Sequence, residues 1–389
     1  MFINFKNNNW KTVVTLFILL FATHLSWSCR SLTIKHSLEK QSTNRNWILF
    51  GGEDRRINYR ANTVAPPLKN VWIYKSTSAI SPTLVVVNGV LYFATLDGRI
   101  EAVNIKTGKR IGRQKNEDNQ EATCAFYKGN LIIASRYGHL TLANYNLENG
   151  KYLWKVDAGD IASEPLVADD GVYISALYNH IDKYDLNSGK KLWSFKTADQ
   201  HRSSPALSKN ILIVGCDNGT LYALNAETGT LEWQIQTDAS IQATPIVWNH
   251  TIFVGSADSL FYAFNLSDGT IQWTFDAQRP LYQTAATDGK VVLFGASDGQ
   301  FYCLNAETGK EIWRFRAKSV VSTAPVISGR VVYFGSLDRR YYCLNLEDGR
   351  ELWSHETKGR IRTSPVVWGN YVFGASEDKF VYAFEHSKR

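Results

Sequence analysis

The sequence predicts an all-β fold, an eight-bladed β-propeller of four-stranded antiparallel blades, and three observations lead to this prediction. A Gly-x-x-x-Trp motif recurs at steps of 39 or 40 residues from Gly150–Trp154 to Gly349–Trp353. Within each period, short apolar runs alternate with Asn-Gly, Asp-Gly or Thr-Gly dipeptides, which supply the positive φ angles of tight hairpins. The repeats keep no helical periodicity. Four short strands in about 40 residues are typical of a propeller blade.

The number of repeats predicts how the ring closes. An Asn or Asp lies four residues before each repeat glycine, at Asn104, Asn146, Asp185, Asn225, Asn265, Asn305 and Asn345. Glu385 takes this place in a last copy that lacks its fourth strand, while Lys69–Lys75, with Trp72, forms a fourth strand without a blade. We expect this N-terminal strand to complete the C-terminal blade. A closed ring leaves no inner edge free to pair with other chains.

The region before the repeats predicts export. Lys6 and Lys11 precede an apolar run over residues 13–22, about half of the ~20 residues that a membrane span needs, so residues 1–28 are predicted to be a signal peptide. Ser26-Trp27-Ser28 before Cys29 resembles a bacterial lipobox, with Ser26 in place of leucine, and predicts lipidation of Cys29; an ordinary signal-peptidase site is the alternative. Residues 29–46 are predicted to be a polar linker that tethers the propeller, residues 47–389.

The recurring tryptophans are predicted to be structural. A tryptophan on the outermost strand of a blade can pack between neighbouring sheets while its N–H reaches a backbone acceptor; ligand stacking is the alternative. The docking set is Trp72, Trp154, Trp193, Trp233, Trp273, Trp313 and Trp353. Gly112 replaces the tryptophan of one repeat, and the polar run 113–120 follows it. We therefore expect this junction to be the most weakly packed of the ring.

The repeat resembles that of a known family. The run from Ala223 to Trp233 is similar to the tryptophan-docking repeat of the PQQ-like propellers, and the segment from Trp47 through Trp72 resembles their opening segment. The family includes quinoprotein dehydrogenases, the outer-membrane assembly lipoprotein BamB and other binding proteins. The resemblance therefore implies the fold and leaves the function open.

Candidate binding residues are expected at the mouth of the axial channel, where the first strand of each blade lines the wall. With the repeats aligned on a column that begins at Pro82, two columns just before it are mostly polar and differ from blade to blade. The candidates are Glu121, Glu164, His201, Arg202, Gln242, Tyr282 and Arg362. Arg202 and Arg362 should face each other across the ring, and we expect them to favour an acidic ligand or an acidic partner loop. A hydrated wall without a ligand is the alternative.

Signatures of enzymes are absent from the sequence. Residues 295–299 fit G-x-S-x-G but span a strand–turn–strand junction, whereas a nucleophile elbow needs a strand followed by a helix. The eight histidines show no zinc-site spacing, and no cysteine pair is adjacent. Catalytic, cofactor and metal residues are therefore not predicted, and neither is a disulfide between Cys303 and Cys343. The net charge of +7 is spread along the chain, which argues against nucleic-acid binding.

Two functions follow from these observations. The first is a non-enzymatic scaffold of the cell envelope, similar to BamB, that presents its loops and channel mouth to a protein partner such as an outer-membrane assembly component. It would be an outer-membrane lipoprotein facing the periplasm, held by a lipid anchor, or a soluble periplasmic protein. The alternative is a periplasmic quinoprotein oxidoreductase that uses PQQ and calcium.

Overall fold

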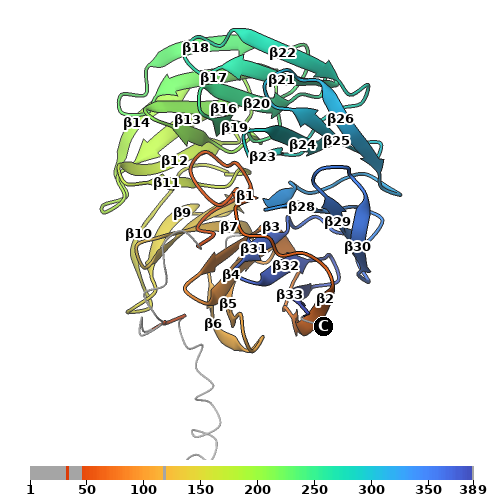
Figure 1. Cartoon of the computed structure of the whole chain (residues 1–389). Coiled ribbons are helices and arrows are strands. Elements are labelled where there is room, and N and C mark those ends of the chain that lie inside the picture. The colour runs from red at the N-terminus through yellow and green to blue at the C-terminus, as the bar shows by residue number, and fades with distance from the viewer. Residues whose placement is uncertain (1–31, 35–45, 117–119, 388–389) are drawn as a thin grey trace, which may run out of the picture.

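The computed structural model describes residues 32–34, 46–116 and 120–387, and it is a closed ring of eight antiparallel sheets (Figure 1). The first strands of most neighbouring blades contact one another, and together the first strands surround the hub. The sequence prediction of an eight-bladed propeller is thereby confirmed. Within the described residues, no helix is long and apolar enough to cross a membrane.

Blades 1 to 4 follow one another along the chain, each from its inner to its outer strand. They are formed by β3 (Ile80–Val87), β4 (Val90–Thr95), β5 (Arg99–Asn104) and β6 (Arg110–Lys115); β7 (Gln120–Tyr127), β8 (Asn130–Tyr137), β9 (Leu142–Asn146) and β10 (Lys151–Val156); β11 (Leu166–Ala168), β12 (Gly171–Ala176), β13 (His180–Tyr184) and β14 (Lys191–Lys196); β15 (Ala206–Ser208), β16 (Ile211–Gly215), β17 (Thr220–Asn225) and β18 (Leu231–Gln236).

Blades 5 to 8 continue the ring, and blades 7 and 8 each take a strand from the N-terminal region. They are formed by β19 (Ile246–Trp248), β20 (Thr251–Gly255), β21 (Leu260–Asn265) and β22 (Ile271–Asp276); β23 (Ala286–Thr287), β24 (Val291–Gly295), β25 (Gln300–Asn305) and β26 (Glu311–Arg316); β1 (Tyr59–Arg60), β27 (Val326–Ser328), β28 (Val331–Gly335), β29 (Arg340–Asn345) and β30 (Glu351–Glu356); β31 (Val366–Trp368), β32 (Tyr371–Ala375), β33 (Phe380–His386) and β2 (Leu68–Lys75).

The ring closes as predicted, because β2 is the fourth strand of blade 8. It pairs antiparallel with β33, and Trp72 lies opposite Ala383. In blade 4 the docking residue Trp233 lies opposite Ala223 in the same way. The equivalent register shows that the two ends of the chain together build one complete blade.

The Gly-x-x-x-Trp motif holds neighbouring blades together. Gly229 has φ +73° and lies so close to the Trp193 ring of the preceding blade that a Cβ would come within 2.6 Å of it. Only glycine fits this contact and this conformation. The Trp193 N–H donates a hydrogen bond of 3.1 Å to the Ala226 carbonyl. Equivalent hydrogen bonds to the next blade are donated by Trp72, Trp154, Trp233, Trp273 and Trp313.

The structure corrects the alignment of blade 1. Val85 pairs with Tyr92 and lies five residues before Val90, as Ala206 lies five before Ile211 in blade 4. Leu84, and not Pro82, is therefore equivalent to Pro205. The error arose because β3 has an irregular register between Ile80 and Leu84, so its proline does not occupy the position that proline takes in blades 3, 4, 5, 7 and 8.

Three residues of the N-terminal region pack against the ring. Leu32 and Ile34 lie in the predicted polar linker but are buried in the apolar cluster shared by blades 1 and 2. Leu32 packs against Gly112, in the space that a docking tryptophan fills elsewhere. The junction at Gly112 is thus filled by another part of the chain, and the expectation that it is the most weakly packed of the ring stays a prediction. Residues 1–28 and Cys29 lie outside the described residues.

Candidate functional site

The hub of the ring is occupied by residues 47–60, which we call the plug (Figure 1). The plug exchanges backbone hydrogen bonds with the inner strands of six blades in the order of the ring. Its partners, in blades 1, 2, 4, 5, 6 and 7, are Val86, Phe126, Leu207, Val247, Thr287 and Ile327. The inner strand of each blade has an edge with no strand beside it, so its N–H and C=O groups on that edge need other partners. The plug supplies hydrogen-bond partners for these groups in the hub. Sequence analysis missed this role, although the apolar residues Trp47, Phe50 and Ile57 were a signal for it.

Arg56 fixes the plug in place and is fully buried. Its guanidinium donates hydrogen bonds to the carbonyl oxygens of Pro205 at 2.7 Å, Phe50 at 3.0 Å and Glu164 at 3.1 Å. Burial lowers the pKa of Arg56 to about 10, which still leaves the side chain charged at neutral pH. A buried cation of this kind requires full hydrogen bonding, and the plug and two blades supply it together.

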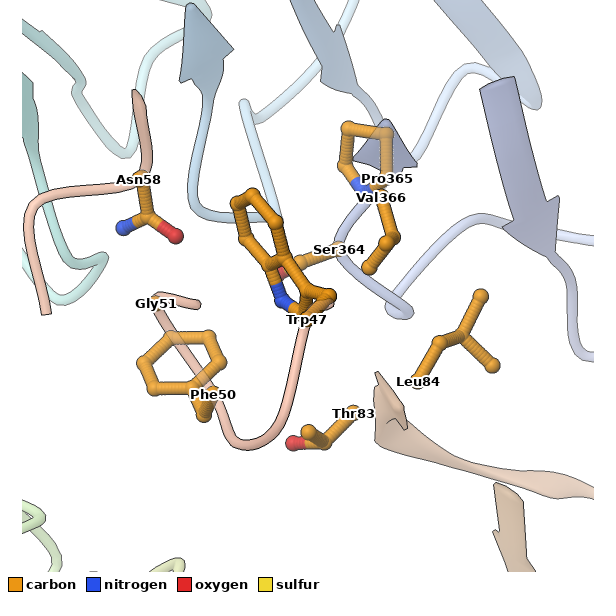
Figure 2. A pocket seen from close by; sticks show the side chains of 9 residues that line it. All are labelled: Trp47, Phe50, Gly51, Asn58, Thr83, Leu84, Ser364, Pro365 and Val366. Atoms are coloured by element: carbon orange, nitrogen blue, oxygen red, sulfur yellow. The ribbon is translucent and has the colours of Figure 1, made fainter. Parts of the chain in front are cut away.

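A small pocket lies between the plug and the inner ends of blades 1 and 8 (Figure 2). It is lined by Trp47, Phe50, Gly51, Asn58, Thr83, Leu84, Ser364, Pro365 and Val366. The Trp47 side chain projects into it between the two blades, and the remaining space leaves no room for a water molecule. This part of the hub is packed and offers no chamber for a ligand.

One of the two polar columns predicted for the channel wall joins the blades to one another. The Ser204 hydroxyl accepts a hydrogen bond from the Glu164 N–H at 2.9 Å, and the Thr244 hydroxyl accepts one from the Ser204 N–H at 3.2 Å. Thr284 and Ser364 accept equivalent bonds from Thr244 and Ala324. The Glu164 carboxylate accepts hydrogen bonds from Thr83 and Ser204, so the structure places this candidate in the inter-blade network.

Five further candidates lie three residues before the column that contains Pro205, and the three charged ones among them form ion pairs within their own blades. Arg202 pairs with Asp217, Arg362 pairs with Glu377 at 2.7 Å, and Glu121 pairs with Arg136 at 2.8 Å. The partner is 15 residues further along in each case, and in blade 2 the two signs are exchanged.

This pairing changes the prediction for the mouth. Gln242 is half-buried, and Tyr282 is 42% exposed. Glu121, Arg202 and Arg362 each have a neighbour of opposite charge, and Arg360 adds a second cation beside Glu377 at 3.0 Å. The expected separation of charge into a basic and an acidic arc is therefore largely cancelled.

His201 is not at the channel mouth, contrary to the sequence prediction. Its side chain is fully buried, with Nδ1 2.8 Å from the Gly215 carbonyl and Nε2 2.8 Å from the Thr197 hydroxyl. Burial lowers its pKa to about 4, so the imidazole is neutral at neutral pH. The error arose because His201 and Arg202 point to opposite environments: consecutive residues of extended chain face opposite sides.

The described residues show no cluster of metal-ligating side chains. Across the described part of the chain, no group of three or more His, Cys, Asp and Glu side chains could hold a metal ion. Cys124, Cys216, Cys303 and Cys343 are free and buried, as expected for cysteines that fill packing positions. The packed pocket beside the plug has no space for a planar tricyclic ligand.

The paired charges at the mouth make a testable prediction. Changing Arg202 to Asp should lower the free energy of unfolding by about 1 kcal/mol, because Asp217 then faces a like charge. Adding Asp217→Arg should restore most of this loss, since blade 2 already carries the exchanged pair. Urea denaturation of the two single variants and the double variant measures the coupling. A double variant as unstable as the sum of the two single ones would contradict the pairing.

Tryptophan-docked blades around a plugged hub define a propeller of the PQQ-like repeat class. A family model described as outer membrane protein assembly factor BamB matches residues 96–200, 178–285 and 278–386, which is more than half of the chain. The chain belongs to this family.

Individual relatives are distant. The chain is 28% identical over 152 residues to tetrathionate hydrolase of Acidithiobacillus ferrooxidans, covering 39% of this chain and 27% of the hydrolase. It is 27% identical over 154 residues to outer membrane protein assembly factor BamB of Burkholderia pseudomallei, covering 37% of this chain and 39% of that protein. These matches thus span less than half of either relative.

Solved structures share the fold at low sequence identity. The crystal structure of BamB from Moraxella catarrhalis superposes with a TM-score of 0.69 at 20% identity, over 82% of this chain and 99% of that one. Quinohemoprotein alcohol dehydrogenase from Comamonas testosteroni superposes with a TM-score of 0.76 at 14% identity, over 90% and 82% of the two chains. At these identities the likeness concerns the fold alone.

Proposed function

We propose that this protein is a non-enzymatic scaffold of the cell envelope that presents the rim and channel mouth of its propeller to a protein partner in outer-membrane assembly. The observation that carries the proposal is the hub: it is packed by the plug, and buried Arg56 joins the plug to blades 3 and 4 through their backbone carbonyls. A filled hub with paired charges at its mouth suits a rigid binding surface. The family supports this assignment.

A strain that lacks this protein tests the scaffold function. We expect it to contain less folded β-barrel protein in its outer membrane, with recovery when the wild-type chain is supplied. Heat-modifiable migration of the barrels on gels measures the folded fraction. An unchanged folded fraction under conditions of high barrel synthesis would contradict the proposal.

The quinoprotein alternative predicts a different result with the purified protein. After incubation with PQQ and calcium chloride and removal of free ligand, we expect no quinone absorbance to remain with the protein and no dye reduction with alcohols. A quinoprotein dehydrogenase treated in parallel is the positive control. Retained absorbance together with alcohol-dependent dye reduction would overturn the scaffold proposal.

Lipidation of Cys29 is the proposed means of attachment to the membrane. Stable anchoring needs two or more acyl chains on one protein, and Cys29 is the residue that would carry them. Changing Cys29 to Ala should therefore move the protein from the membrane fraction to the soluble periplasmic fraction. Ser28→Ala, which keeps a small residue before the cysteine, is the matched control and should leave the protein on the membrane. If the wild type is already soluble, an ordinary signal-peptidase site is the correct reading.

A further inference from the structure

The seam between blades 1 and 2 carries a feature that the scaffold function does not explain. Residues 32–34, which we call the clip, occupy this seam, and Leu32 is fully buried. The Ile34 N–H donates a hydrogen bond of 2.8 Å to the Leu147 carbonyl. Leu147 follows Asn146, just as Leu266 follows Asn265 and accepts the N–H of Trp233. The clip therefore takes the acceptor that a docking tryptophan takes elsewhere in the ring.

Gly112 and the clip are complementary. A Cβ at Gly112 would lie 2.8 Å from the Leu32 side chain, so any larger residue would displace the clip. The Tyr145 hydroxyl donates a hydrogen bond of 2.9 Å to the Leu32 carbonyl. The clip is thus bound to blade 2 through its backbone, and its two apolar side chains pack between blades 1 and 2. It fixes one point of the N-terminal region to one edge of the ring.

This attachment limits the distance between the anchor and the propeller. Only three residue steps separate Leu32 from Cys29. A fully extended chain spans at most about 3.6 Å per residue, so Cys29 can lie no more than about 11 Å from Leu32. If Cys29 carries the lipid, as proposed above, the seam must lie close to the membrane surface.

The rim beside the seam has the charge that an anionic membrane attracts. The last turn and outer strand of blade 1 expose five basic side chains, and residues 102–116 contain no acidic residue. These side chains are Lys106, Lys109, Arg110, Arg113 and Lys115. The equivalent stretch of blade 5, on the opposite side of the ring, carries Asp268 and Asp276 and no basic residue within 266–276. The two sides of the rim therefore differ in the sign of their charge.

The geometry points to the outer strand of blade 1, β6, and its preceding turn as a membrane-facing surface that binds anionic phospholipid headgroups. The inference rests on the proposed lipidation of Cys29 for its location and on the five basic side chains for its chemistry. Basic residues near an anionic surface attract it within about a Debye length, ~8 Å at physiological salt. The clip contacts β6 itself at Gly112 and so holds this strand on the side of the ring that is nearest to the anchor.

A chemically tethered protein tests this orientation. Cys29 in a chain that begins at this residue is coupled to a maleimide lipid in vesicles, since the cysteines of the described region are all buried. The vesicles contain either phosphatidylcholine alone or phosphatidylcholine with phosphatidylglycerol. Hydrogen exchange is measured for residues 106–116 and for the equivalent residues 307–317 of blade 6. We expect exchange at 106–116 to slow roughly fivefold or more on the anionic vesicles only, with 307–317 unchanged.

A matched pair of charge reversals identifies the side chains responsible. Gly112 lies opposite Ala102, and Trp313 lies opposite Cys303, so β6 and β26 have the same register. Arg113→Glu with Lys115→Glu should abolish the slower exchange. The same change of charge at the equivalent positions, Arg314→Glu with Arg316→Glu, should leave it intact. Leu32→Asp with Ile34→Asp should also abolish it, and thermal melting reports whether the propeller stays folded.

The outcomes separate this inference from its premise. Three results would overturn the proposed membrane-facing surface. They are equal slowing of hydrogen exchange at the blade 1 and blade 6 segments, slowing on neutral vesicles, and slowing that persists in the Arg113→Glu, Lys115→Glu variant. Slowing that needs an added envelope protein would assign the basic rim to a protein partner and would equally overturn it. Because the tether is chemical, these results do not depend on natural lipidation, which the fractionation of Cys29→Ala tests separately.

Discussion

Deletion of residues 375–389 is expected to prevent folding. The deletion removes β33, which pairs with β32 on one side and with β2 on the other. It also removes the buried side chains of Val381, Tyr382 and Phe384. Burial of three such side chains contributes roughly 5–9 kcal/mol, which is comparable with the whole stability of a typical domain. Without β33, the edge of β2 and the Trp72 side chain are left unpaired.

Expression level and denaturation measure this effect. We expect the truncated chain to be recovered as aggregate or degraded, because exposed strand edges pair with other chains. Removal of residues 388 and 389 alone, which leaves β33 whole, is the control and should be tolerated. A soluble chain lacking residues 375–389 with the wild-type melting temperature would contradict closure of the ring through blade 8.

Changing Arg56 to Ala is expected to lower the free energy of unfolding by roughly 3–5 kcal/mol. The carbonyl oxygens of Phe50, Glu164 and Pro205 would lose their donor in a buried site. Each unsatisfied buried acceptor costs about 1–3 kcal/mol. Arg56→Lys should recover little of the loss, because a single ammonium cannot reach acceptors spread around a planar guanidinium.

The neighbouring Arg55 provides the matched control. Its side chain is 36% exposed and pairs with Glu53 at 2.7 Å. Arg55→Ala should change stability by less than about 1 kcal/mol, as is usual for an exposed ion pair. Urea denaturation of both variants measures the difference. If Arg56→Ala and Arg55→Ala were equally stable, the plug would not depend on the buried guanidinium.

The fold was predictable from the sequence because its determinants are local and repeat. Gly229 and Trp193 show why: the glycine turn and the docking tryptophan are needed at each blade junction, so the same residue types return every 40 positions. Closure through Trp72 was predictable for the same reason, because the segment around Trp72 matched the fourth strand of a repeat and the last repeat lacked that strand. When a motif repeats at a fixed period, the contact between blades that it makes can be predicted for every junction from the sequence.

The tertiary structure alone decided what fills the hub and the seam. Arg56 reaches carbonyls more than 100 residues away, and Leu32 packs against Gly112 across 80 residues, yet neither belongs to a repeat. His201 and Arg202 are adjacent and polar, but the fold buries one and pairs the other with Asp217. The sequence by itself determined the ring, its eight blades and its closure. Contacts made once, between segments far apart, leave no period in the sequence, and only the folded chain brings them together.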